Sequence, residues 1–222
     1  FAREHAAWGY GIRRVGPDEM RRIEPGLKIV PDHAYHVAAE GAVEPAETAR
    51  LLLSGARALG AEVLDHSHVR WLVEEANRVV GIMTDEGIIH ADEVVVAAGG
   101  GSQQLLDSVG IAIRLTAPPG LLSHSKPAPE LLRGLLMTPG LHVRQTREGR
   151  LVAGTDFAGA DPMGKADALA QDLHGRVQAL VAGAEMVALD FHTVGYRPTP
   201  ADGFPAIGRP RNREGLYVAV TH

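Results

Sequence analysis

The residue best suited to chemistry in this chain is Arg197, which stands near the start of the segment YRPTPADGFPAIG, residues 196–208. A guanidinium can hold a carboxylate through two parallel charge-assisted hydrogen bonds, which fix orientation as well as charge. The segment also contains three prolines and two glycines, which restrict or re-aim the backbone: Pro198, Pro200, Pro205, Gly203 and Gly208. We therefore expect a rigid loop that presents Arg197 to an anionic ligand. The alternative is a structural salt bridge to Asp202 or Asp190.

Histidines supply weaker candidates. His66 and His68 would lie on one face of a strand, and His33 and His36 form a second close pair, but no convincing carboxylate ligands accompany them, so we predict no metal site. His142 falls in a predicted strand. A half-buried histidine with a structural hydrogen bond is one interpretation, and contact with a substrate is the other.

A second candidate binding element is the glycine turn at residues 99–101. It follows a continuous apolar run at 94–98, typical of a strand covered on both faces, and precedes a helix predicted over 102–109. A strand, a glycine turn and a helix can present backbone N–H groups to a phosphate or ribose. The alternative is a tight turn with Ser102 as the N-cap of the helix.

Periodicity and turn residues predict the elements that must position these groups. We expect helices over 17–23, from Pro45 to a C-cap at Gly60, and over 169–180 despite Gly175. Strands are expected at 34–39 and 61–64, in an antiparallel meander of 69–73, 79–84 and 88–91, in a hairpin of 141–145 and 150–154, and at 215–222.

Two segments together resemble a known family. Residues 92–99 (DEVVVAAG) and the Arg197 segment with its following strand are similar to flavin-dependent amino acid oxidases and dehydrogenases, which include glycine oxidase, sarcosine oxidase and D-amino acid dehydrogenases. In that family the motif R-P-x-x-x-D-G-x-P-x-I-G supplies the arginine that binds the substrate carboxylate. The following strand ends in G-H or T-H, as Thr221-His222 does here. The resemblance extends from about residue 16 onward.

The resemblance implies roles for individual residues. Substrate binding is implied for Arg197 and for His142, which falls where some relatives place a tyrosine near the substrate. FAD contacts are implied at Val69, Ala98, Gly99, Gly100 and His222. The pattern identifies no catalytic base.

The implied fold class is α/β to α+β: part of an FAD-binding doubly wound domain with a small antiparallel meander, plus a mixed antiparallel substrate domain. Residues 1–40 and 111–195 are assigned to the substrate domain, and residues 41–110 and 196–222 to the FAD-binding domain.

The implied activity is oxidation of the C–N bond of a small amino acid or secondary amine, by hydride transfer to flavin N5. The partner is then a small carboxylate-bearing substrate, with an electron acceptor that the sequence does not identify. Two alternatives remain: an FAD-dependent 2-hydroxy acid dehydrogenase, which would use the same arginine, and a non-catalytic binding protein of the flavin fold.

The sequence also departs from the family pattern. It contains no G-x-G-x-x-G for the FAD pyrophosphate, begins with Phe1 and ends where the family's glycine-rich flavin loop begins. We therefore expect an internal fragment that is inactive and retains FAD poorly by itself.

Composition excludes several classes. A net charge of -5 and 5% aromatic residues argue against nucleic-acid binding. Zero cysteines exclude disulfides and thiolate chemistry within the 222 residues, and no apolar run approaches the roughly 20 residues of a transmembrane segment. We expect a cytoplasmic protein.

Overall fold

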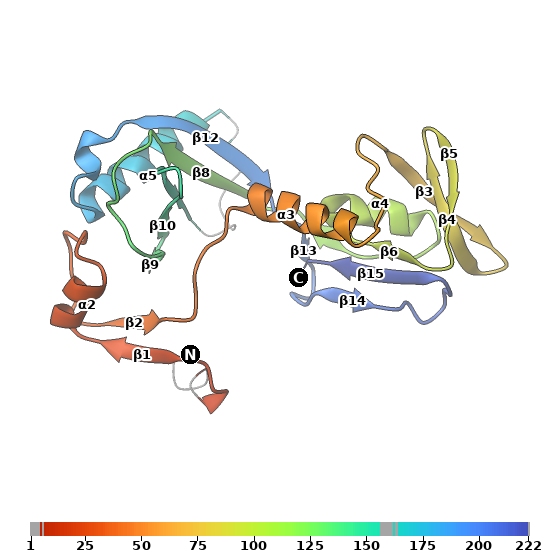
Figure 1. The fold of residues 1–222 in the computed structure, drawn as a ribbon, viewed down its shortest axis with the longest axis horizontal. Helices are drawn as coiled ribbons and strands as arrows, with labels where there is room; N and C mark the ends of the chain where they lie inside the picture. Colours follow the sequence, from red (N-terminus) through yellow and green to blue (C-terminus); the bar gives the residue numbers. More distant parts are fainter. Residues whose placement is uncertain (1–4, 6, 156–161, 163, 222) are drawn as a thin grey trace. The chain divides into compact units, whose positions relative to one another are not determined.

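The chain folds into two compact units, each built from two separate segments of sequence. The computed structural model describes residues 5, 7–155, 162 and 164–221. Unit 1 comprises Phe1–Leu51 and Pro119–Gly195, and unit 2 comprises Leu52–Pro118 and Tyr196–His222. The chain therefore passes between the units three times, after residues 51, 118 and 195. Figure 1 shows that each unit has its own sheets.

The main element of unit 1 is a five-stranded sheet of order β12-β8-β11-β10-β9. Its strands are Leu189–Tyr196, Pro119–Ser125, Leu151–Gly154, Leu141–Gln145 and Leu136–Thr138, in the same order. The predicted hairpin is confirmed, because β10 and β11 pair antiparallel and the N–H of Thr146 donates to the oxygen of Arg150 at 2.8 Å across the turn. Since side chains alternate along a strand, this sheet has one face for a core and one for other contacts.

Helix α5 (Ala166–Leu180) packs against one face of this sheet, on β8, β10 and β11 (Figure 1). The apolar residues that meet there are Leu121, Leu141, Val143, Leu151, Ala153, Ala170, Leu173 and Val177, all buried. Gly175 lies inside the helix as predicted, and a Cβ at that position would meet nothing within 4 Å. Burial of the other helix face therefore outweighs the cost of about 1 kcal/mol for an interior glycine.

The N-terminal part of unit 1 is an antiparallel ribbon of β1 (Ile12–Val15) and β2 (Ala34–Val37), with α2 (Pro17–Ile23) between them. As predicted, Pro17 occupies the first turn of α2. Glu24 follows the helix, and its Oε2 accepts the N–H groups of Arg133 and Gly134 at 2.9 and 3.0 Å. A buried carboxylate thus holds the loop before β9 against the end of α2. The short helix η2 (Ala184–Met186) follows α5.

The first sheet of unit 2 is the predicted meander, β3-β4-β5, with strands Val69–Glu75, Arg78–Thr84 and Gly87–His90. The β3–β4 turn consists of Ala76 and Asn77, both at positive φ (46° and 69°). A two-residue turn of this kind matches the twist of a hairpin, and asparagine tolerates it well. Helix α3 (Pro45–Ala58) ends before Gly60, also as predicted, and spans the first boundary between the units.

The second sheet of unit 2 has the order β14-β15-β6 (Ala206–Gly208, Leu216–Val220, Val94–Val96). Strands β15 and β6 are parallel, and Val218 lies opposite Val96. Helix α4 (Ser102–Asp107) contributes Leu106 to the same core. A two-stranded pair, β13 (Thr199–Pro200) with β7 (Leu115–Thr116), completes the unit.

Three details of the sequence prediction are wrong. Residues 61–64 form no strand, because they are largely exposed and find no partner strand. The strand expected at 94–98 ends at Val96, and Val95 is 61% exposed, so this strand is not covered on both faces. Ser102 is the first residue of α4 rather than its N-cap. The broader expectation of a mixed α/β fold with several sheets is confirmed.

One glycine of unit 2 provides a test of this packing. Gly215 has φ +68°, its oxygen accepts the N–H of Val94 at 2.8 Å, and a Cβ would overlap the carbonyl oxygen of Val79. Gly203 has a similar φ of +76° but open space around the Cβ position. We expect Gly215→Ala to reduce the free energy of unfolding by about 3 kcal/mol, of which about 1 is conformational strain and about 2 overlap. Gly203→Ala should cost only the strain, about 1 kcal/mol.

Urea denaturation followed by circular dichroism measures both values. Equal losses in the two variants would contradict the overlap at Gly215.

Candidate functional site

Arg197 lies directly after β12, where the chain has just entered unit 2 for the last time. Its backbone N–H donates to the oxygen of Pro118 at 3.1 Å. Pro118 is the last residue of unit 2 before the chain leaves for β8. One hydrogen bond within unit 2 therefore joins two of the three places where the chain passes between the units, and it fixes the backbone of the candidate arginine.

The residues after Arg197 are joined to the same neighbouring segment. Thr199 pairs with Thr116 in the β13–β7 ladder, and the Thr116 hydroxyl donates to the oxygen of Thr199 at 3.2 Å. The Thr199 hydroxyl donates to the oxygen of Arg197 at 3.2 Å, and the N–H of Ala201 donates to the oxygen of Arg114 at 3.0 Å. These bonds, rather than proline content alone, hold the loop in one conformation.

The two carboxylates that could have formed a structural salt bridge with Arg197 have other partners. Asp202 Oδ1 accepts the N–H of Phe204 at 3.1 Å, which closes the turn around Gly203. Asp190 binds the guanidinium of Arg150 at 2.5 Å. Arg197 itself is an exposed residue. Asp202 and Asp190 each therefore have a structural role apart from Arg197.

His142 is half-buried in β10, on the sheet face opposite α5. It lies across from Gly154, which in turn pairs with Leu122 of β8. A Cβ on Gly154 would lie 2.6 Å from Cδ2 of Leu122, so this position admits only glycine without a shift of the leucine. On this face of the sheet, the neighbours of His142 are therefore the backbone of Gly154 and the side chain of Leu122.

Arg144, two residues further along β10, lies on the same face. Its guanidinium makes two hydrogen bonds to the carboxylate of Glu44, at 2.7 and 3.2 Å. These hydrogen bonds lower the pKa of Glu44 from its usual value, against the opposing effect of burial. The pair is only partly exposed, with 20% and 33% of the two side chains accessible, so the charge of Arg144 is largely compensated within unit 1.

A second imidazole, His124 of β8, shares this face. Its ring stacks on Phe191 of β12 with centroids 4.4 Å apart, and its Nε2 lies 3.0 Å from the hydroxyl of Thr193. Burial lowers the pKa of His124, and the positive charges of Arg150 and Arg144 lower it further. His124 is therefore neutral near pH 7. The sequence pattern did not single it out, because its neighbours lie some 20 to 70 residues away and only the strand register brings them together.

The residues implied for FAD gather mainly at one edge of unit 2. Because β6 and β15 are parallel, their carboxyl ends lie at the same edge, where a ligand of an open α/β sheet is expected. Ala98, Gly99 and Gly100 follow β6 at this edge. Thr221 follows β15 there, and His222 lies outside the described residues. Val69 is half-buried at the start of β3, in the other sheet of the unit.

The glycine turn has a conformation that suits close approach. Gly99 has φ +55°, and a Cβ on Gly99 or Gly100 would meet nothing within 4 Å. Ser102, which is fully buried, accepts the N–H of Ala98 at its hydroxyl, at 3.1 Å. The Ala98 N–H is thus used within the turn, which leaves Gly99 and Gly100 as the residues of this turn that can approach a ligand most closely.

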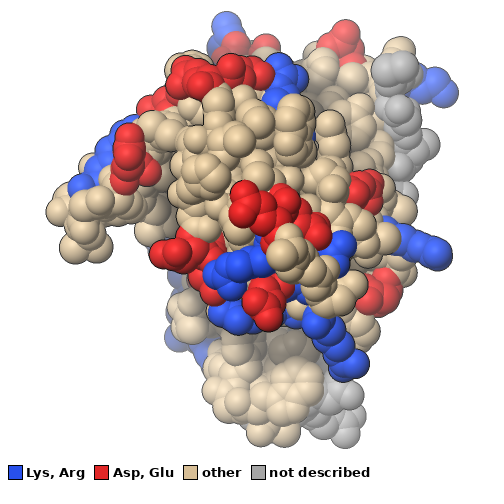
Figure 2. Space-filling model, turned by 90° about the vertical axis from the view of Figure 1, so that its right-hand side faces the viewer, with Lys and Arg blue, Asp and Glu red and all other residues tan. Residues whose placement is uncertain are grey.

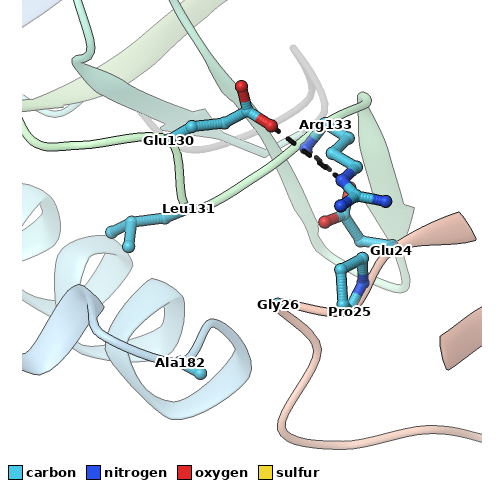
Figure 3. A pocket seen from close by; sticks show the side chains of 7 residues that line it. All are labelled: Glu24, Pro25, Gly26, Glu130, Leu131, Arg133 and Ala182. Carbon is cyan, nitrogen blue, oxygen red and sulfur yellow. Dashed lines mark hydrogen bonds and ion pairs between the residues drawn. The ribbon is translucent and has the colours of Figure 1, made fainter. Parts of the chain in front are cut away.

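Within the described part of unit 1, a smaller and a larger cavity lie away from His142. The smaller, of about 270 Å³, lies between Glu24, Arg133 and Ala182 (Figure 3). The larger, of about 1150 Å³, lies between the β1–β2 ribbon, β9 and the end of α5. Within the described part of the chain, no group of three or more histidine, aspartate or glutamate side chains could hold a metal ion.

The surface carries charges of both signs. On the face shown in Figure 2, acidic and basic side chains are interspersed, and no large basic area stands out. Ion pairs of unit 2 such as Arg78–Glu93, Arg70–Asp85 and Arg213–Glu74 have the same mixed character. Among the described helices, none is both long and apolar enough to cross a membrane.

Comparison with known proteins identifies similar sequences and folds. The model of the family described as FAD dependent oxidoreductase matches residues 1–222. The glycine oxidase of Pseudomonas putida is 30% identical over 92% of this chain and 56% of its own length. The D-amino-acid oxidase of Bradyrhizobium diazoefficiens is 30% identical over 96% of this chain and 52% of its own length. The chain thus spans about half the length of these relatives.

Solved structures show the same fold at lower identity. The glycine oxidase from Geobacillus kaustophilus superposes with a TM-score of 0.83 at 22% identity, over 100% of this chain and 60% of that one. An L-amino acid deaminase from Proteus vulgaris gives a TM-score of 0.84 at 17% identity, over 99% and 58% of the two chains.

The lowered pKa of His124 predicts an acid-dependent loss of stability. Its pKa in the folded state lies below the unfolded value of 6.5, so the unfolded chain binds more protons as the pH falls below that value, and stability decreases. We expect His124→Gln to flatten the decrease in unfolding free energy just below pH 6.5. Thr193→Val should keep it, because burial and the two arginines cause the shift.

The measurement is a series of urea denaturations between pH 7.5 and about 5.5, a window that brackets an ordinary histidine pKa. If wild type and His124→Gln lose stability equally over this window, His124 is not the group responsible.

Proposed function

The chain belongs to the FAD dependent oxidoreductase family, and on that premise we propose that it forms part of an enzyme that oxidises the C–N bond of a small amino acid or secondary amine. The observation that carries the proposal is the match of the family model along all 222 residues. Relatives named glycine oxidase and D-amino-acid oxidase support the choice of an amino acid as substrate. Because the chain spans about half of their length, the activity is proposed for the complete protein.

Arg197 binds the substrate carboxylate in this proposal. Its backbone is held by Pro118 and by the β13–β7 pair, so the guanidinium starts from a fixed position. A fixed two-pronged donor sets the direction of the Cα–H bond as well as neutralising the carboxylate charge. The family resemblance also implies a substrate contact for His142.

FAD would be held by unit 2, which we propose is part of a doubly wound dinucleotide-binding domain. The described residues fit the cofactor: Ala98, Gly99 and Gly100 follow β6 at the edge where the parallel strand β15 also ends, and the glycine turn leaves space for close approach. His222, which comes next after Thr221 in the sequence, is proposed on the family resemblance alone. Val69 would contribute backbone near the adenine. When bound, FAD supplies the acceptor for a hydride from the substrate Cα.

The remaining alternatives differ in chemistry that an experiment can separate. A 2-hydroxy acid dehydrogenase would use the same arginine, and a non-catalytic protein would show no substrate-dependent reduction of flavin. Anaerobic addition of glycine, N-methylglycine, D-alanine and their 2-hydroxy analogues to the complete protein, with bleaching of the flavin absorbance as the readout, distinguishes them. Bleaching by the amines alone supports the proposal, and bleaching by the hydroxy acids alone or by none of them contradicts it.

Replacement of Arg197 tests its role directly. In the complete protein, Arg197→Lys exchanges a two-pronged fork for a point charge, so we expect KM for the carboxylate substrate to rise about tenfold or more, which corresponds to about 1.4 kcal/mol of binding. Arg211→Lys is the matched control, because Arg211 is another exposed arginine of unit 2. Steady-state kinetics measure both.

An unchanged KM in Arg197→Lys would exclude the carboxylate role. An equal rise in Arg211→Lys would show that the effect reflects general surface charge.

A further inference from the structure

The larger cavity of unit 1 is surrounded by exposed apolar side chains, which is unusual for a surface that faces only solvent. It lies between the β1–β2 ribbon with α2 on one side and β9 with the end of α5 on the other. Three large apolar residues that line it remain well exposed: Ile29 at 62%, Tyr35 at 53% and Met137 at 66%. Apolar residues gathered around one hollow, rather than scattered singly, indicate a surface that meets another molecule.

Two polar atoms in this wall are buried without a hydrogen-bond partner among the described residues: Glu24 Oε1 and His36 Nδ1. Glu24, which also lines the smaller cavity (Figure 3), is only 4% exposed, and its other oxygen accepts the N–H groups of Arg133 and Gly134. An unsatisfied buried polar group costs about 1–3 kcal/mol. Both atoms are enclosed within the wall, so a molecule in the cavity would contact the apolar residues around them.

The β1–β2 ribbon also lacks support by itself. The two strands pair only with each other within the described residues, and α2 between them buries a single apolar residue, Met20. A two-stranded ribbon is marginally stable in water unless further polypeptide packs against it. Its solvent-exposed Tyr35 and the cavity behind it mark the side on which that packing is absent.

The volume of the cavity favours a polypeptide segment over a small molecule as its occupant. Its volume of about 1150 Å³ exceeds the range of about 300–1,000 Å³ that is usual for small-molecule sites. The relatives have polypeptide beyond what this chain matches, which covers 56% of one and 52% of another. We propose that this cavity is the docking surface for a further segment of the same protein, one that packs apolar side chains against Ile29, Tyr35 and Met137.

The absence of cysteine from the chain allows a clean test. Met137→Cys places a single thiol in the cavity, and Glu148→Cys places one in the exposed β10–β11 turn as a control. The rate of alkylation by a neutral maleimide is measured in this chain alone and in the complete protein, with each labelled peptide identified by mass. We expect docking to slow the alkylation of Met137→Cys about tenfold or more in the complete protein, while the alkylation rate of Glu148→Cys stays unchanged.

Each other outcome overturns the proposal. Equal rates for Met137→Cys in both proteins would show that no further segment covers the cavity. Slow alkylation of Met137→Cys in the chain alone has two readings. If the rate depends on protein concentration, a second copy of the chain covers the cavity. If the rate does not, the cavity is closed within a single chain. Ile29→Cys, at another exposed position in the same wall, repeats the test should Met137→Cys disturb the fold. The result does not depend on which substrate the protein oxidises.

Discussion

The parallel pairing of β6 with β15 is the constraint on which unit 2 depends. Val96 and Val218 lie opposite each other although most of unit 1 separates them in the sequence, and a parallel pair always requires such a long connection. Val96, Leu216, Val218 and Val220 are buried together. The pairing also brings the glycine turn after β6 and the end of β15 to one edge. The same strand pairing therefore forms the core of unit 2 and brings the candidate FAD-binding residues to one edge of the sheet.

Much of the fold follows from cues that act over a few residues, and those predictions are confirmed. Pro17 opens α2, Ala76-Asn77 turns β3 into β4, and the hairpin of β10 and β11 closes around Gly149. Each cue limits φ or satisfies a turn locally, so no distant partner is needed. The substrate-binding role that the family motif implies for Arg197 stays a prediction. The bonds that hold the loop of Arg197 to residues 114–118 lay beyond the sequence pattern, because they join segments about 80 residues apart.

The wrong predictions share a cause. A strand forms only with a partner strand, and an N-cap forms only where its side chain meets the free backbone N–H groups of a helix. Residues 61–64 have the composition of a strand but no neighbour to pair with. Ser102 has the chemistry of an N-cap, yet the turn at Gly99 begins the helical winding three residues earlier, and the hydroxyl bonds back to Ala98. The lowered pKa of His124 arises mainly from burial and further from Arg150 and Arg144, which neighbouring strands bring close. Partner strands and their register decide such features, and a single sequence does not reveal register.

The charged side chains near His142 are compensated by partners within unit 1. Arg144 is bound by Glu44 and Arg150 by Asp190, while His124 is neutral, so the face around His142 offers a ligand little net charge. Arg144 and Arg150 are thus already paired, and a further charge buried on this face would lack a partner among these residues.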